Sequence, residues 1–133
     1  MRIGSAAVML AVVLGAAGTG CATQADPAAQ GAATEFARAV AGRDGAAACR
    51  LLAPATRSEL EQSAGKRCAT AILEEGLPRA GATEEFSTFG TMAQVRFRGD
   101  VMFISEFKSG WKVLAAGCSP VPKRPYECQL QGG

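Results

Sequence analysis

The side chains best suited to chemistry in this sequence are its five cysteines, Cys21, Cys49, Cys68, Cys118 and Cys128. The chain contains no histidine, which excludes a Ser–His or Cys–His nucleophile pair and a histidine-ligated metal site. The cysteines are spaced too widely for a zinc site, which usually begins with a closely spaced pair. No Cys-x-x-Cys pair is present for thiol redox catalysis. We therefore expect structural cysteines, no metal and no cofactor.

The N-terminus has the pattern of a secretory signal. Met1 and Arg2 supply positive charge, and residues 6–17 form an uncharged, mostly apolar run. As a helix this run spans about 18 Å, which is shorter than the roughly 30 Å hydrocarbon core of a bilayer. Such a length is typical of cleaved signals rather than of transmembrane helices. We predict a signal peptide over residues 1–20, and the alternative is a buried N-terminal helix.

The segment Gly18-Thr19-Gly20-Cys21 follows this run. It resembles the lipobox of bacterial lipoproteins, in which a small residue precedes a cysteine that becomes diacylated. Gly18 departs from the pattern, which usually has an aliphatic residue at that position. The small and polar residues 21–26 suit a tether, and two acyl chains give stable anchoring. The resemblance implies lipidation of Cys21, and the alternative is ordinary secretion after cleavage at a neighbouring small residue.

Four cysteines remain when Cys21 is lipidated, and an exported chain meets an oxidising environment that favours disulfides. We predict the pairs Cys49–Cys68 and Cys118–Cys128, because each closes a short loop between neighbouring elements. Each bridge would stabilise the fold by roughly 3 kcal/mol through the entropy of the unfolded chain. That contribution matters for a small domain with only 6% aromatic residues.

The first half of the chain beyond the tether has helical periodicity. Apolar residues recur on one helical face after Pro27, and Asp26 with Pro27 forms a favoured helix start. Gly42 ends this pattern. Shorter helices are predicted for residues 46–52, 55–62 and 66–75.

The second half alternates apolar and polar residues, as strands do. Gly99–Asp100 is typical of a two-residue hairpin turn, and residues 119–125, with three prolines, predict a stiff loop. Helices followed by strands indicate an α+β fold, with N-terminal helices packed on a curved antiparallel sheet of four to five strands. We expect one domain over residues 27–133. Its strands are predicted over residues 83–89, 92–98, 101–107, 111–116 and 126–130.

Two further segments carry a second resemblance: residues 36–54 with their Gly-Arg-Asp-Gly and Leu-Leu-Ala-Pro motifs, and Gly110-Trp111-Lys112-Val113. Together with Cys21, they resemble small secreted lipoproteins of high-GC Gram-positive bacteria. The domain is similar to the nuclear-transport-factor-two-like cone fold, also called cystatin-like, whose curved sheet often holds a pocket at its open end. The resemblance implies a pocket, and the alternative is that its residues fill the core. The expected lining is Phe36, Val40, Ile72, Val95, Phe97, Phe103, Phe107 and Trp111.

Some families of the cone fold are enzymes that place an acidic residue in the pocket. Glu106, on the strand face of Met102 and Ile104, is the best candidate for such an acid. The adjacent pairs Glu74–Glu75 and Glu84–Glu85 form no carboxylate dyad, because neighbours in a helix or strand point in different directions. We assign no catalytic residue, and a small secreted isomerase or hydrolase remains the alternative.

Charge and composition complete the functional expectation. The formal net charge of +2 is too small to indicate nucleic-acid binding. Arg96, Arg98 and Lys112 could form a weakly positive sheet face toward anionic lipid or wall polymer, or an ordinary solvated face. We predict an exported lipoprotein, anchored by Cys21 on the outer face of the cell membrane, with a non-catalytic binding or protein-interaction domain. Its partner is expected to be an envelope protein or a small apolar ligand, and a structural role in an envelope complex is the further alternative.

Overall fold

The computed structural model describes residues 26–132, in which four helices precede five strands. The strands pair antiparallel in the order β1-β2-β3-β4-β5, so the predicted α+β class is confirmed. The predicted signal peptide and Cys21 lie outside the described residues. The helices are α1 (Pro27–Ala41), α2 (Gly45–Arg50), α3 (Pro54–Ala64) and α4 (Cys68–Glu74). The strands are β1 (Thr83–Phe89), β2 (Met92–Phe97), β3 (Asp100–Phe107), β4 (Gly110–Val121) and β5 (Arg124–Gln131).

Local sequence signals start α1 and α2 as predicted, whereas α2 ends at Arg50 and α4 begins at Cys68, inside the ranges predicted for them. The Asp26 carboxylate accepts the amide hydrogen of Ala28 at 2.8 Å, and Pro27 occupies the first helical position of α1. Asp44 caps α2 in the same way, accepting from the Ala47 amide at 3.0 Å. These side chains satisfy amide groups that a helix N-terminus leaves without partners.

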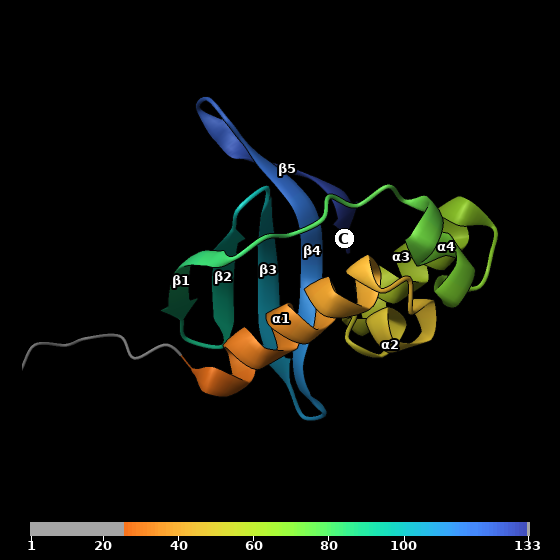
Figure 1. The fold of residues 1–133 in the computed structure, drawn as a ribbon, viewed down its shortest axis with the longest axis horizontal. Helices are drawn as coiled ribbons and strands as arrows, with labels where there is room; N and C mark the ends of the chain where they lie inside the picture. The colour runs from red at the N-terminus through yellow and green to blue at the C-terminus, as the bar shows by residue number, and fades with distance from the viewer. Residues whose placement is uncertain (1–25, 133) are drawn as a thin grey trace, which may run out of the picture.

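The helices cover one face of the sheet. In Figure 1, α1 crosses this face obliquely, and α2, α3 and α4 gather beside β4 and the C-terminus. Thr56 of α3 is fully buried, and its hydroxyl donates to the Leu114 carbonyl of β4 at 2.9 Å. The segment between α2 and α3 also joins the sheet, since the Val113 amide donates to Leu51 at 2.7 Å and the Ala53 amide donates to Val113 at 2.8 Å. The helical half is therefore fastened to β4 by hydrogen bonds as well as by packing.

The core lies between α1 and the helix-facing side of the sheet. Burial of apolar side chains there supplies the main drive for folding. Alternation along the strands places a smaller cluster around Val101, Ala115 and Cys118 on the opposite side. The largest fully buried side chains are Phe36, Ile72, Met102, Ile104, Val95 and Val113.

The prediction of a proline-rich loop over residues 119–125 is wrong. Strand β4 continues to Val121 and β5 begins at Arg124, so Pro122 and Lys123 form the turn of a hairpin. Figure 1 shows this hairpin projecting beyond the rest of the sheet. Prolines are tolerated there because the projecting part of β4 has β5 on one side and no neighbour on the other within the described chain.

The predicted hairpin turn at Gly99–Asp100 is displaced by one residue. The turn consists of Arg98 and Gly99, and Asp100 is the first residue of β3, opposite Phe97. Gly99 has a φ of 88°, which suits glycine. The displacement moves Asp100 from an exposed turn into the sheet, where 5% of its surface is exposed.

Both predicted disulfides are present. Cys49 of α2 is bonded to Cys68 of α4, which holds the short helices together. Cys118 and Cys128 face each other in register on β4 and β5 and are bonded across the hairpin. The four cysteines of the described chain are thereby all paired.

Candidate functional site

The eight residues expected to line a pocket do not gather around one cavity. Phe36, Ile72, Val95, Phe97 and Trp111 are buried in the main core, as the alternative interpretation expected. Val40 is half-buried against this core.

The remaining two members of that set lie elsewhere. Phe103 lies on the opposite sheet face, where its ring meets Tyr126 edge-on with centroids 5.2 Å apart. Phe107 is 36% exposed. Glu106, the candidate catalytic acid, is exposed near the end of β3, so it does not share the burial of Met102 and Ile104.

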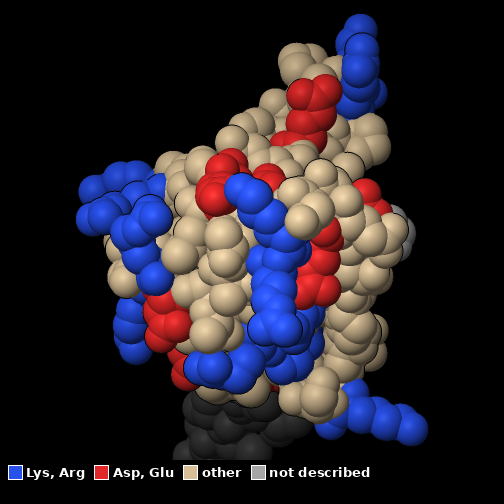
Figure 2. Space-filling view, turned by 90° about the vertical axis from the view of Figure 1, so that its right-hand side faces the viewer, with Lys and Arg blue, Asp and Glu red and all other residues tan. Residues whose placement is uncertain are grey.

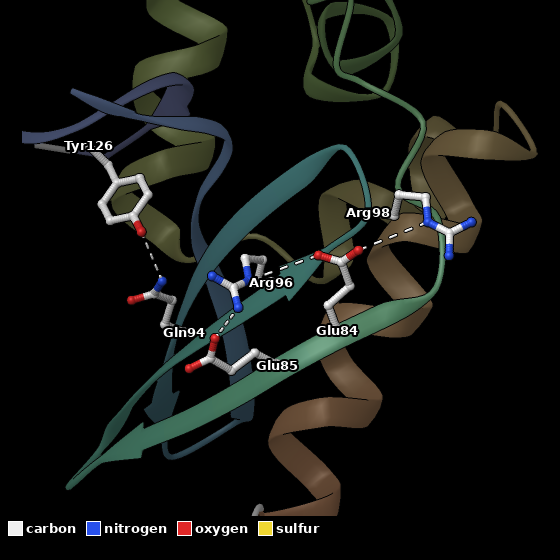
Figure 3. Close-up of polar contacts among 6 residues, drawn as sticks. All are labelled: Glu84, Glu85, Gln94, Arg96, Arg98 and Tyr126. Carbon is white, nitrogen blue, oxygen red and sulfur yellow. Dashed lines mark hydrogen bonds and ion pairs between the residues drawn. The ribbon is translucent and has the colours of Figure 1, made fainter. Parts of the chain in front are cut away.

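The expected positive sheet face is largely neutralised by acidic neighbours. Figure 3 shows Arg96 between Glu84 and Glu85, with ion pairs to both. Arg98 also approaches Glu84, at 4.0 Å. Lys112 takes no part in this face, since its ammonium group donates to the Arg50 carbonyl of α2. Salt bridges between exposed side chains contribute little stability, but here they cancel the charge that an anionic partner would need.

A groove beside the Cys49–Cys68 bridge carries more positive charge than the sheet face around Arg96. Its charged lining residues are Arg50, Arg57, Glu61, Lys66 and Arg67. Figure 2 shows Lys and Arg side chains gathered over the helical end. Part of this charge is neutralised, because Arg57 pairs with Glu61 at 3.5 Å and Lys66 pairs with Glu74 at 2.5 Å. No orphaned buried polar atom is found among the residues that line this groove.

Asp100 is the chemically unusual residue of the described chain. Its side chain is buried, and neither carboxylate oxygen has a hydrogen-bond partner. Burial raises the pKa of Asp100 from 3.8 to about 6, although the nearby amide groups of Gly117, Val101 and Cys118 act to lower it. An ionised carboxylate without a partner is costly to bury, so this site favours either a proton or a cation.

Asp100 lines a cleft of about 500 Å³ between three parts of the chain. The β2–β3 turn supplies Gly99, the segment after α4 supplies Gly76 and Pro78, and the rest comes from the β4–β5 hairpin. Gly117 has a φ of 65°, and a Cβ atom there would lie 2.5 Å from Oε1 of Gln129. A glycine is needed at this point for Gln129 to lie against β4. The hairpin contributes Gly117, Cys118, Ser119, Glu127, Cys128 and Gln129.

The polar side chains of this cleft are oxygen-rich. They comprise two carboxylates, Asp100 and Glu127, the Ser119 hydroxyl and the Gln129 amide, and no Lys or Arg lines the cleft. This arrangement can accept hydrogen bonds from a positively charged group. Within residues 26–132 no group of three or more His, Cys, Asp or Glu side chains is placed to hold a metal ion.

Sequence reasoning missed Asp100 because the Gly-Asp pair was assigned to the turn itself. The alternation of β3 offers a signal, since Asp100 shares its strand face with Met102 and Ile104. Its burial depends further on the segment after α4 and on the β4–β5 hairpin, which are distant in sequence.

Comparison of the chain with models of protein families, with curated proteins and with solved structures found no match. None of the helices between residues 26 and 132 is both long enough and apolar enough to span a membrane.

Proposed function

We propose that this protein is an exported lipoprotein, anchored through Cys21 to the outer face of the cell membrane, whose domain is a non-catalytic binding module. The observation that carries the proposal is the position of exposed hydrophobic side chains. Phe89, Met92 and Phe107 are the large hydrophobic residues exposed in the described chain, with exposed fractions of 66%, 44% and 36%. We call these three residues the apolar tip.

The apolar tip lies at one end of the sheet. Phe89 and Met92 pair across the β1–β2 turn, and Phe107 immediately precedes the β3–β4 turn. The Thr91 carbonyl accepts hydrogen bonds from the Glu106 amide at 2.8 Å and the Ser105 hydroxyl at 3.1 Å, which ties the two regions together. Both turns lie at the lower edge of Figure 1, where α1 also begins.

The tether is short enough to hold this end of the domain at a bilayer. Cys21 is six residues before Pro27, and six extended residues span at most about 20 Å. A diacylated Cys21 would therefore bring the start of α1, and with it the apolar tip, to the membrane surface. Aromatic and aliphatic side chains gain free energy by entering the interface, which strengthens anchoring by acyl chains.

The same orientation leaves the cleft at Asp100 open to the surroundings. Asp100 begins β3, whereas Phe107 ends it, so the cleft and the apolar tip lie at opposite ends of this strand. The β4–β5 hairpin, which forms one wall of the cleft, points away from the start of α1 in Figure 1. The domain would thus present its binding site away from the membrane.

The cysteine pairing supports export from the cytoplasm. The two disulfides use the four cysteines of the described domain, and disulfides persist mainly in oxidising compartments. Cys21 is left as the one cysteine of the sequence without an assigned structural partner, as lipidation requires.

The anchor is tested by metabolic labelling of cells with a palmitate analogue. We expect labelling of the native protein and of a Thr23→Ala control, and loss of label in Cys21→Ala. Equal labelling of Cys21→Ala and the native chain would refute lipidation at this residue.

The apolar tip is tested with the full chain carrying Cys21→Ala and vesicles of phosphatidylglycerol and phosphatidylcholine. Phe89→Ser should weaken vesicle binding about tenfold, because insertion of a phenyl ring is worth roughly 1 to 2 kcal/mol. Val121→Ser, at the end of the projecting hairpin, should leave binding unchanged. If Phe89→Ser bound as tightly as its parent, the apolar tip would not be a membrane contact.

A further inference from the structure

The amide groups of Gly117, Val101 and Cys118 favour the ionised form of Asp100, but no positively charged side chain lines its cleft. Of the charged residues on the adjoining elements, Glu127 lines the same cleft and adds negative charge. Arg98 points to Glu84 on the β1 side and is 79% exposed. Arg79 lines a different cavity beside Val40. Glu75 lines another, between α3 and β5.

The burial of Asp100 is unexplained by the fold alone. Buried carboxylates in proteins are nearly always paired or hydrogen-bonded, whereas both oxygens of Asp100 lack a partner and 5% of the residue is exposed. Asp100 forms part of the cleft wall with Ser119, Glu127 and Gln129. Both carboxylate oxygens are closed to solvent, so a donor in the cleft reaches them when the side chains that line it move aside.

We infer that the cleft at Asp100 binds its ligand through a primary ammonium or guanidinium group, held by Asp100 and Glu127 with the Ser119 hydroxyl and the Gln129 amide oxygen as further acceptors. Such groups carry several N–H donors and no acceptor, which complements this lining. A cleft of about 500 Å³ lies within the range that accommodates small ligands or a side chain of a partner. Calcium, which takes six to eight oxygen ligands, would require more acidic groups than the described chain brings together.

The inference names the ligand class of the proposed binding module, and it rests on the proposed function only for the outward orientation of the cleft. It carries a pH dependence. The Asp100 carboxyl is protonated in the empty cleft at acidic pH, because its pKa is about 6. Affinity for a cation should therefore rise about tenfold between pH 5 and pH 8 as the carboxyl ionises. Glu127, the second carboxylate of the cleft, is exposed.

The experiment uses the full chain with Cys21→Ala, both disulfides intact, and ¹H–¹⁵N spectra at pH 8 and pH 5. The probes are 1,5-diaminopentane, end-blocked Ala-Lys-Ala and Ala-Arg-Ala, the Nε-acetylated form of the lysine peptide, and calcium chloride. The diamine and the peptides distinguish a free small cation from a basic side chain of a polypeptide.

Saturable shifts of the Gly117, Ser119 and Gln129 amides with an ammonium or guanidinium probe would support the inference. These shifts should be lost with the acetylated peptide and weaken about tenfold at pH 5. Asp100→Asn should abolish them, Glu127→Gln should weaken them, and Glu106→Gln, outside the cleft, should retain them.

The inference is overturned if no cationic probe saturates these shifts, if the acetylated peptide binds equally, or if calcium binds more tightly than the organic cations. The inference is also overturned if Asp100→Asn still binds the cationic probes. If Asp100→Asn does not fold, the acetylated control and Glu127→Gln still decide the matter. None of these outcomes bears on the anchor, which the labelling experiment tests separately.

Discussion

Replacing Asp100 by asparagine should remove a pH-dependent destabilisation of the domain. Asparagine has the shape of a protonated aspartic acid but cannot ionise. The pKa of Asp100 is about 6 in the folded protein, against an ordinary value of 3.8. Since each pKa unit corresponds to about 1.4 kcal/mol, ionisation of Asp100 costs the folded state about 3 kcal/mol at full effect.

The sign follows from proton binding. Between pH 3.8 and about pH 6 the folded state holds a proton on Asp100 that the unfolded chain has released. The contribution of this residue to stability is therefore greatest at acidic pH and is lost as the pH rises through this window. About 2 kcal/mol of the change falls between pH 4.5 and pH 7.5.

The assay is urea unfolding of the oxidised protein at several pH values, followed by circular dichroism. The free energy of unfolding of Asp100→Asn, relative to the parent, should increase by about 2 kcal/mol from pH 4.5 to pH 7.5. Contributions of the exposed carboxylates cancel in this difference, and Glu106→Gln should follow the parent. A difference that does not change with pH, or that falls as the pH rises, would refute the placement of Asp100 in a site that disfavours its charge.

Three further predictions concern stability and use the same unfolding assay. Replacing Cys118 and Cys128 together by alanine should lower the free energy of unfolding by about 3 kcal/mol under non-reducing conditions; no loss would mean that this bridge constrains nothing. Thr56→Val should lose about 1 kcal/mol, because the part-buried Leu114 carbonyl then loses its hydroxyl donor and keeps the Gly132 amide at 3.2 Å; a neutral effect would argue against a stabilising hydrogen bond between α3 and β4. Gly117→Ala should lose roughly 1 to 2 kcal/mol through its positive φ and its close contact with the facing glutamine; an unaltered stability would show that β4 adapts at this point.

The parts of the fold that local chemistry determines were predictable from the sequence. Asp26 and Asp44 mark helix starts because their carboxylates accept amide hydrogens of the first helical turn. Pro27 suits the first helical position because its ring fixes φ at a helical value. Alternation and glycine placed the strands, and the short separations of the cysteines indicated their pairing. In each case the deciding residues lie within a few positions, or one short loop, of the feature they specify.

The β4–β5 hairpin could not be predicted in the same way. Pro120 and Pro125 argue against a strand in the middle of a sheet. They are compatible with this hairpin because it extends beyond β3. That extension depends on where another strand ends, which local patterns do not specify.

The candidate site was missed for a related reason. A turn at Gly99–Asp100 places Asp100 outside the strand and exposes it to solvent, so the one-residue displacement of the turn hid the burial of Asp100. The cleft itself requires the chain after α4 to lie against the turn and the hairpin. The interpretation of the apolar residues as core, by contrast, holds for Phe36, Val95 and Trp111.

The central claim, export with lipidation of the first cysteine, is tested most directly by the mass of the protein isolated from its native cells without reduction. We predict a chain that begins at Cys21, carries the added mass of a diacylglyceryl group, and has lost four hydrogens to two disulfides. A chain that begins at Met1 without lipid, and with its thiols free, would contradict the account.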